Sequence, residues 1–515
     1  MSSLTPTESR LPLNRIDDVL IHHSRRATWV LAGLVFLALN VTMRFSLHQP
    51  PVWDGAMSVY PAAIELTRTD FDFARLFSLP TYLEGGPNTH STSPWTVIVA
   101  CLIAATGSLA NALPILHTIS FALAALTVAA AYRLIAHSAP GVIAVLGAMG
   151  VLLFPPMMVQ TADIYLDLPV ACLGTWSLVM LLERRIVAAS LLTTLAVWVK
   201  PLAVIFAAVG VTFIYLHDRS ARRLRHALAF FGPPSTIAVV IAFLEDTSSK
   251  PQLAERYMIS LGGSARLLGA MPDLIVLGLV SLFCIFSMAK RAVRHDTLTI
   301  TGLMLLSSAA FLLLNPVVSY GVPLLPRYYV VIVPAVVAGA LSFIWSKSRA
   351  IAISGVTALI LAFALNLNGS FYPYEDHATF ALAERSFAYR DLLSLQIEDV
   401  SRLTLLSQEM PVYYDYFAFY RFEYPELGYS DGPLSSGISV FHIPEIAQIS
   451  LQDMPNRFAF IFEYPVLGGE ELLRIWQEAR ESDARLTETA LSRGRYTVYI
   501  VEVNQDESVN PSGQE

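Results

Sequence analysis

Long runs of apolar residues recur along the first 370 or so of the 515 residues, and short polar segments separate them. A helix needs roughly 20 mainly apolar residues to cross a bilayer. Eleven runs approach or reach that length and predict membrane helices, at 27–46, 112–133, 139–157, 168–183, 186–199, 201–217, 226–243, 273–289, 297–314, 328–345 and 350–367. A twelfth run, 94–106, is shorter, and it fits either a spanning helix or one that lies at the interface.

The distribution of lysine and arginine predicts the orientation, because these residues concentrate in cytoplasmic loops. If 94–106 does not span, 16 basic residues fall on the side of the N-terminus and 8 on the other, with the C-terminal region left out. Counting 94–106 as a span inverts every later loop. The pattern therefore predicts about 11 spans, with the N-terminus in the cytoplasm. The first run is long and no small-residue cleavage pattern follows it, so we expect it to remain as a membrane helix.

The last 145 or so residues follow a different pattern. "ATFALAERSFAYRDLLSLQI" and "EELLRIWQEARESDARL" have apolar residues at helical spacing, whereas "RFAFIFEYP" and "RYTVYIVEV" are typical of strands. From Glu375 onward there are 24 acidic residues, 10 arginines and no lysine. A region with this charge is a poor nucleic-acid binder, and it predicts a separate soluble α/β domain.

Composition agrees with this division. Hydrophobic residues make up 54% of the chain and charged residues 15%, whereas soluble domains are about one-quarter charged. The predicted fold class is a polytopic α-helical membrane protein with a C-terminal soluble α/β domain. The predicted parts are a cytoplasmic segment at 1–26, a membrane domain at 27–370 with a long outer loop at 47–93, and an extracytoplasmic α/β domain at 371–515.

Ionisable residues gather at the predicted outer boundary of the membrane. The loop 47–93 is longer than a connection requires, and loops of that length are usually functional. Carboxylates can deprotonate a hydroxyl or amine, and lysine or arginine can stabilise a phosphate. The candidate site residues are Asp54, Glu84, His90, Asp163, Asp167, Lys200, Arg256 and Arg327.

Six of these candidates also have a structural interpretation. Lys200 would snorkel from a helix end to the interface, and Arg327 would anchor a helix beside two tyrosines. The acidic residues and the histidine would be a helix cap (Asp54), solvated loop carboxylates (Asp163 and Asp167) and a structural hydrogen-bonding residue (His90). Scattered residues of this kind are a weak motif on chemistry alone.

Their order along the chain is more specific. Five short stretches follow one another within residues 27–345: "WDGAMSVYPAAIELTRTDFDF", "EGGPNTHSTSPWTVIVACLIAATG", "FPPMMVQTADIYLDLPVACLGTWSLVMLLERR", "LLTTLAVWVKPLAVIFAAVGV" and "LLPRYYVVIVPAV". This order resembles the GT-C superfamily of polyprenyl-phosphate-sugar-dependent glycosyltransferases, which includes protein O-mannosyltransferases and lipid A aminoarabinose transferases. The sequence departs from the family pattern at Gly55, where a second acid is usual, and at "HSTSP", which replaces an "HPPL"-like stretch.

The resemblance implies a role for several candidates. Asp54 would face the active-site cavity and activate the acceptor, or would help coordinate a divalent metal ion that does so. Lys200 and Arg327 would contact the leaving polyprenyl phosphate, with Arg256 as a weaker candidate for the same work. The family's "HPPL"-like helix lies at the interface without crossing, in agreement with the orientation inferred for 94–106.

The predicted function is an integral-membrane glycosyltransferase of the bacterial cytoplasmic (inner) membrane. It would move a sugar from a polyprenyl-phosphate carrier to a lipid, glycan or protein acceptor of the cell envelope, on the extracytoplasmic face. A polysaccharide polymerase or ligase, and a membrane transporter, remain as alternatives. A transporter should carry ionisable or broken-helix features near the midplane, whereas the ionisable groups here cluster at one face. No compact metal motif such as HExxH occurs in the sequence, so metal dependence stays open, as do the sugar and the acceptor.

Overall fold

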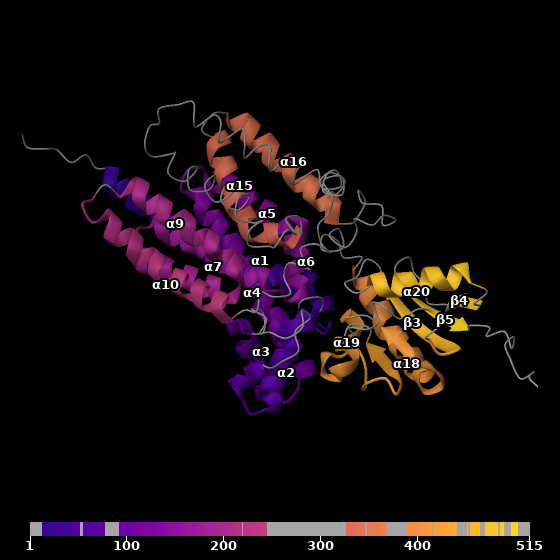
Figure 1. Ribbon diagram of the computed structural model, residues 1–515. Coiled ribbons are helices and arrows are strands. Elements are labelled where there is room, and N and C mark those ends of the chain that lie inside the picture. The colour runs from indigo at the N-terminus through magenta and orange to yellow at the C-terminus, as the bar shows by residue number, and fades with distance from the viewer. Residues whose placement is uncertain are drawn as a thin grey trace, which may run out of the picture.

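The computed structural model describes residues 13–51, 55–77, 92–218, 220–244, 326–345, 348–367, 389–414 and 416–439, with 451, 454–463, 469–482, 485–488 and 496–502. The predicted runs 273–289 and 297–314 lie outside these residues. The described part is mostly helical, with one small sheet near its C-terminal end. The division into a helical bundle and an α/β region is visible in Figure 1, where the sheet and its helices lie beside the bundle.

The bundle consists of helices that largely coincide with the apolar runs. Its long members are α1 (Leu13–Thr42), α4 (Leu109–Ala136), α5 (Gly141–Leu153), α7 (Asp167–Leu182), α8 (Ile186–Val199), α9 (Val204–His217), α10 (Arg223–Leu244), α15 (Tyr329–Trp345) and α16 (Arg349–Leu367). Shorter elements connect them: η1 (Arg44–Ser46), η2 (Gly55–Val59), α2 (Tyr60–Arg68), η3 (Phe73–Phe77), α3 (Pro94–Thr106), α6 (Pro155–Asp163), η4 (Pro201–Ala203) and η5 (Pro326–Tyr328).

One predicted span is broken in the structure. The run 139–157 was expected as a single helix, but α5 ends at Leu153 and α6 begins at Pro155, with a bend of 61° between them. Two consecutive prolines, Pro155 and Pro156, explain the break, because the residue before a proline is disfavoured in the helical region. Phe154 accordingly has an extended backbone, with ψ 120°. The predicted run is therefore interrupted by a bend, and its crossing of the membrane as one span stays a prediction.

Length and composition allow few of the described helices to cross a membrane alone. Leu109–Ala136 and Arg223–Ile241 are long and apolar enough, and the bent pair α5–α6 adds a third if it acts as one span. The other apolar helices of the described residues have 10–17 residues, among them α7, α8, α15 and much of α16. The count of about 11 spans, and their orientation, stay predictions.

Helix α3 occupies the ambiguous run 94–106. Ser93 caps it, because its Oγ accepts a hydrogen bond from the Trp95 backbone N–H at 3.3 Å. Gly107 ends it in the left-handed conformation, with φ +82°, which is the ordinary role of glycine at a helix C-terminus. Its 13 residues span about 20 Å, less than the roughly 30 Å of a bilayer's hydrocarbon core. The helix is therefore too short to cross on its own.

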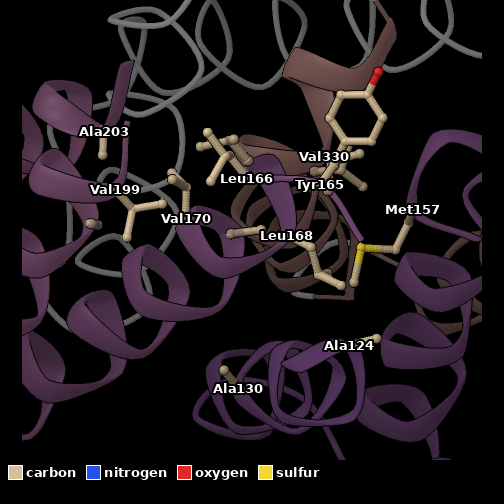
Figure 2. Packing of buried hydrophobic residues seen from close by; sticks show 14 of the residues in the cluster. Ala124, Ala130, Met157, Tyr165, Leu166, Leu168, Val170, Val199, Ala203 and Val330 are labelled. Carbon is tan, nitrogen blue, oxygen red and sulfur yellow. The ribbon is translucent and has the colours of Figure 1, made fainter. Parts of the chain in front are cut away.

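Close packing holds the middle of the bundle together. Figure 2 shows the residues that α7 and the turn before it bury against α8, η4 and α15, among them Leu166, Val170, Val199 and Val330. Helices α7 and α9 touch at Gly174, where an added Cβ would lie 2.1 Å from the ring of Phe206. No larger residue fits there without moving that ring. The turn before α7 thus rests on a tightly packed support.

The C-terminal region contains a five-stranded mixed sheet with the order β2-β1-β3-β5-β4. Strand β1 pairs in parallel with β2 and β3, and β5 pairs antiparallel with β3 and β4. The elements are α18 (Tyr389–Glu409), β1 (Val412–Tyr414), α19 (Tyr416–Glu423), η6 (Pro425–Leu427), β2 (Gly437–Ser439), β3 (Arg457–Glu463), α20 (Gly469–Glu481), β4 (Arg485–Glu488) and β5 (Tyr496–Glu502). The predicted strands in "RFAFIFEYP" and "RYTVYIVEV" are confirmed as β3 and β5.

Each face of this sheet is covered by helix. Because side chains alternate along a strand, Ala459 and Ile461 of β3 join a core with Leu403 of α18, and Phe458 and Phe460 join another with Ile475 of α20. The sheet is therefore the middle layer of an α/β/α arrangement. Its α19 and η6 approach the bundle near α2 (Figure 1).

Candidate active site

Four of the predicted site residues lie within the described residues: Asp163, Asp167, Lys200 and Arg327. The other four, Asp54, Glu84, His90 and Arg256, lie outside them. The described residues nearest to Asp54 in the sequence are Pro51 and Gly55, and both are buried.

The turn between α6 and α7 carries the first part of the site. Asp163 ends α6 and is partly buried, and Asp167 begins α7 and is fully buried. Between them, Ile164 adopts the left-handed conformation with φ 57° and ψ 52°. A β-branched residue is disfavoured there, so the surrounding packing must hold this backbone in place. The turn buries Tyr165 as well as Asp167.

Lys200 reaches this turn from the break between α8 and η4. Pro201 prevents the helix from continuing through Lys200, whose backbone is extended with φ −155° and ψ 126°. The Lys200 Nζ donates to Asp167 Oδ1 at 2.7 Å, and the side chains are 8% and 0% exposed. The alternatives of a snorkelling lysine and of a solvated Asp167 are therefore wrong.

Arg327 enters from η5, at the start of α15. It is buried, and its Nη1 donates to the Tyr165 hydroxyl at 3.3 Å. Its guanidinium carbon lies 5.3 Å from the centre of the Tyr165 ring and 5.5 Å from that of Tyr328. The Lys200 Nζ lies 4.6 Å from the centre of the same Tyr328 ring. The interpretation of Arg327 as an anchor at the membrane surface is wrong, because its side chain is buried.

These five residues, Tyr165, Asp167, Lys200, Arg327 and Tyr328, form what we call the Lys200 cluster. It holds two cations and one carboxylate, so its formal charge is +1. Within the described residues, Asp167 Oδ2 has no hydrogen-bond partner. Ammonium and guanidinium groups are the side-chain groups that bind phosphate most often. The cluster is therefore suited to receive an anionic group such as a phosphate.

A small crevice links the Lys200 cluster to the first outer loop. It is lined by Gly55, Val59, Ile164, Tyr165, Leu166 and Lys200. Figure 2 shows the Tyr165 hydroxyl directed away from the apolar side chains packed below it. Gly55, which follows Asp54 in the sequence, lines this crevice together with Lys200.

The tyrosines of the cluster were not among the predicted site residues. Tyr328 was interpreted only as an interfacial aromatic, and Tyr165 was not singled out. Their positions in the sequence could have indicated both tyrosines as site residues. Tyr165 lies between two acids in "QTADIYLDLP", and Tyr328 follows Arg327. Among the residues that the structure describes, no three His, Cys, Asp or Glu side chains are placed to hold a metal ion. A metal bound through Asp54 stays a prediction.

Comparison with known proteins gives a similarity of fold. No protein-family model matches the chain, and no curated protein matches it. Two solved structures of ArnT from Cupriavidus metallidurans are similar to it, one bound to undecaprenyl phosphate and one in the apo state. Each is 15% identical and covers 92% of this chain and 98% of the other, with TM-scores of 0.46 and 0.42 respectively.

Proposed function

We propose that this chain is an integral-membrane glycosyltransferase that takes a sugar from a polyprenyl-phosphate carrier and transfers it to an acceptor of the cell envelope. One observation carries the proposal: two buried cations, Lys200 and Arg327, lie against the same tyrosine ring, that of Tyr328. Cations and a general base are the groups that such a transfer requires. The motif order described above supports the same conclusion.

The chemistry assigns a different task to each group. The acceptor hydroxyl or amine gives its proton to the Asp54 carboxylate while its oxygen or nitrogen attacks the anomeric carbon of the sugar. The bond between that carbon and the phosphate oxygen breaks, and its electron pair leaves with the polyprenyl phosphate. Because nucleophile and leaving group lie on opposite sides of the carbon, the configuration inverts. No cofactor is consumed.

Lys200 and Arg327 act on the leaving phosphate, where negative charge develops. A hydrogen bond to a charged group contributes about 1.5–3 kcal/mol, and burial strengthens the electrostatic part because little water screens it. Asp167 holds the Lys200 ammonium in place before the donor arrives. When the phosphate enters, the ammonium lies between two anions and contacts both, so the pair need not separate.

The extracytoplasmic placement of the reaction follows from the predicted topology. The cluster is built at the turn between α6 and α7, between α8 and η4, and in η5 before α15, and the distribution of basic residues predicts that these ends lie on the outer side. The carrier would present its phosphate at the membrane boundary, with its polyprenyl chain in the lipid. The acceptor is a lipid, glycan or protein, and the fold alone does not select among them.

Two measurements test the proposal. The purified full-length protein is incubated with synthetic polyprenyl-phosphate sugars and envelope extract, and labelled product is followed. In parallel, envelope lipids and glycans from cells with and without the protein are compared by mass spectrometry. We expect transfer of one sugar type and the loss of the corresponding envelope modification. A protein that transfers no sugar and whose removal leaves the envelope unchanged would overturn the proposal, and movement of intact substrate across vesicles would show a transporter.

A further inference from the structure

The turn between α7 and α8 gathers arginine side chains around one carboxylate. The side chain of Glu183 is 10% exposed, and its Oε1 accepts a hydrogen bond from Arg133 Nε at 2.7 Å. Its Oε2 lies 3.5 Å from Arg25 Nη2 and 3.7 Å from Arg185 Nε. Arg184, between Glu183 and Arg185 in the sequence, is exposed. We call these five residues the Glu183 cluster. It holds four guanidinium groups and one carboxylate, so its formal charge is +3.

The backbone of this turn gives arginine a position that glycine usually occupies. The Arg184 N–H donates to the Leu181 carbonyl at 3.0 Å, and the Arg185 N–H donates to the Met180 carbonyl at 2.8 Å. Arg184 lies in the left-handed region, with φ 58°. This is the Schellman ending of a helix, in which the left-handed residue is usually glycine, because a Cβ disfavours that conformation. Residues held in such conformations concentrate at functional sites.

Two exposed guanidinium groups converge above the carboxylate. Arg133, whose side chain is 4% exposed, binds Glu183 through two of its nitrogens, so one buried cation already balances this acid. Arg25 and Arg185 are 47% and 56% exposed. Because both lie close to Oε2, their contacting nitrogens are no more than about 7 Å apart. Each guanidinium carries five N–H donors, and the remaining donors of both suit one phosphate placed between them.

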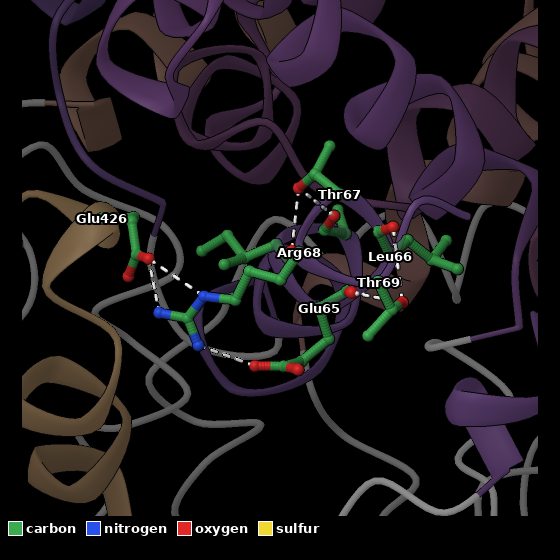
Figure 3. A network of polar contacts seen from close by, with 8 residues as sticks. Glu65, Leu66, Thr67, Arg68, Thr69 and Glu426 are labelled. Atoms are coloured by element: carbon green, nitrogen blue, oxygen red, sulfur yellow. Dashed lines mark hydrogen bonds and ion pairs between the residues drawn. The ribbon is translucent and has the colours of Figure 1, made fainter. Parts of the chain in front are cut away.

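Another exposed arginine has the opposite surroundings. Arg68 of α2 lies between two carboxylates, those of Glu65 in its own helix and of Glu426 in η6, as Figure 3 shows. An anion that approached Arg68 would meet two negative charges. At the Glu183 cluster, one carboxylate faces several cations. Charge complementarity therefore favours an anionic ligand at the Glu183 cluster and disfavours one at Arg68.

Exposed apolar side chains lie directly beside the Glu183 cluster. Trp29 follows Arg25 by one helical turn and so lies on the same face of α1. Its ring stacks on that of Trp176 in α7, with the ring centres 5.7 Å apart, and it is 60% exposed. Val187 and Leu191, in the first turns of α8, are 73% and 59% exposed. Tryptophan is enriched where a membrane meets water. A phosphate that carries acyl chains would therefore find partners for both of its parts.

The Glu183 cluster is separate from the Lys200 cluster. Helix α7 begins at Asp167, which pairs with Lys200, and ends at Leu182, directly before Glu183. Its 16 residues span about 24 Å, so the two clusters lie at opposite ends of this helix. The distribution of basic residues predicts that the end with Glu183 lies on the cytoplasmic side. A ligand bound there is not the sugar donor of the proposed reaction.

We propose that the Glu183 cluster binds the headgroup of an anionic phospholipid in the leaflet that is predicted to be cytoplasmic. The phosphate lies between Arg25 and Arg185, and the acyl chains run along Trp29 and the start of α8. Glu183, fixed by Arg133, holds the two exposed guanidinium groups in place. This inference requires that the bundle is in a membrane, but it does not depend on the transferase activity.

The test compares two lipids that differ in net charge. The full-length protein in detergent is titrated with phosphatidylglycerol and, separately, with zwitterionic phosphatidylcholine, and bound lipid is measured by native mass spectrometry. Two arginines near a membrane surface predict a preference of roughly thirtyfold for the anionic lipid. In Arg25→Gln/Arg185→Gln, which keeps the contact between Arg133 and Glu183, the preference should fall below about threefold. Equal binding of both lipids by the wild type would overturn the proposal.

A matched control removes the same charge from the same end of the bundle. Ser190 Oγ donates to the Phe230 carbonyl at 2.9 Å, so the first turns of α8 and α10 lie side by side. Arg222 and Arg225, at the start of α10, are exposed and do not belong to the Glu183 cluster. We expect Arg222→Gln/Arg225→Gln to keep the lipid preference within about twofold of the wild type. An equal loss in both double variants would show a general effect of surface charge and would overturn the site.

Two measurements on the wild type cover the case in which Arg25→Gln/Arg185→Gln fails to fold. A photoactivatable phosphatidylglycerol in vesicles should label peptides that contain Trp29 or Val187, and labelling confined to other peptides would overturn the proposal. An excess of soluble glycerol phosphate should not displace the lipid; displacement would show a site for free phosphate compounds and overturn the lipid assignment. A protein that binds the lipid as expected but transfers no sugar would refute the proposed function alone.

Discussion

The buried pair of Lys200 and Asp167 gives the sharpest test of how the site is built. Lys200→Met keeps the length of the side chain and its fit among apolar neighbours but removes its charge. Asp167, fully buried, then loses the partner of Oδ1, and its Oδ2 has no partner among the described residues. Breaking a buried ion pair in this way costs about 3–5 kcal/mol, because an uncompensated charge stays inside. We therefore expect a clearly lower unfolding temperature in detergent.

Donor binding should weaken for a separate reason. Loss of one charge-assisted contact to the phosphate removes about 1.5–3 kcal/mol, which corresponds to roughly a ten- to hundredfold increase in the donor dissociation constant. Binding of polyprenyl phosphate itself can be measured without any acceptor. Arg68→Gln, which removes an exposed cation that does not belong to the Lys200 cluster, serves as the control and should lose less than about 1 kcal/mol of stability.

The double variant Lys200→Met/Asp167→Asn separates the two effects. Neutralising Asp167 removes the stranded charge, so stability should return to within about 1–3 kcal/mol of the wild type, the usual cost of an unsatisfied buried polar group. The donor phosphate still lacks its lysine, and its binding should stay weak. A single Lys200→Met variant that is as stable as the wild type and binds polyprenyl phosphate equally well would refute both parts of the reasoning.

Three further predictions concern the base, the second cation and the topology. Asp54→Asn should lower kcat roughly 10²- to 10⁴-fold at unchanged thermal stability, because asparagine caps a helix about as well as aspartate; retained transfer would exclude the base assignment. Arg327→Lys keeps the charge but loses the planar stacking on two tyrosines, so donor KM should rise about tenfold, and an unchanged KM would show that charge alone matters. Cysteines placed at Ser91 and Ser435 should label from outside and one at Ser220 from inside; labelling of Ser91 and Ser435 from opposite sides would show that α3 crosses the membrane.

Hydrophobic periodicity in the sequence by itself determined most of the secondary structure. A run of apolar residues predicts a helix because the signal is local and repeats every turn, and α4, α8 and α16 lie where the runs predicted them. Strands β3 and β5 were likewise visible in their β-branched and aromatic residues. The break between α5 and α6 was also predictable from the local sequence, because Pro155 and Pro156 are adjacent. The long apolar run around them was interpreted instead as a single membrane helix.

The tertiary structure alone decided which of these residues meet. Lys200 and Asp167 are 33 residues apart, and Arg327 lies 162 residues from Tyr165. Their contacts depend on how far each helix extends and on how α7, α8 and α15 pack, and no local pattern encodes that. The same holds for Tyr429 and Pro51, which come from opposite ends of the chain. A local pattern records what one segment prefers, whereas a site depends on the close packing of several segments, so the candidate residues were predictable individually and their pairing was not.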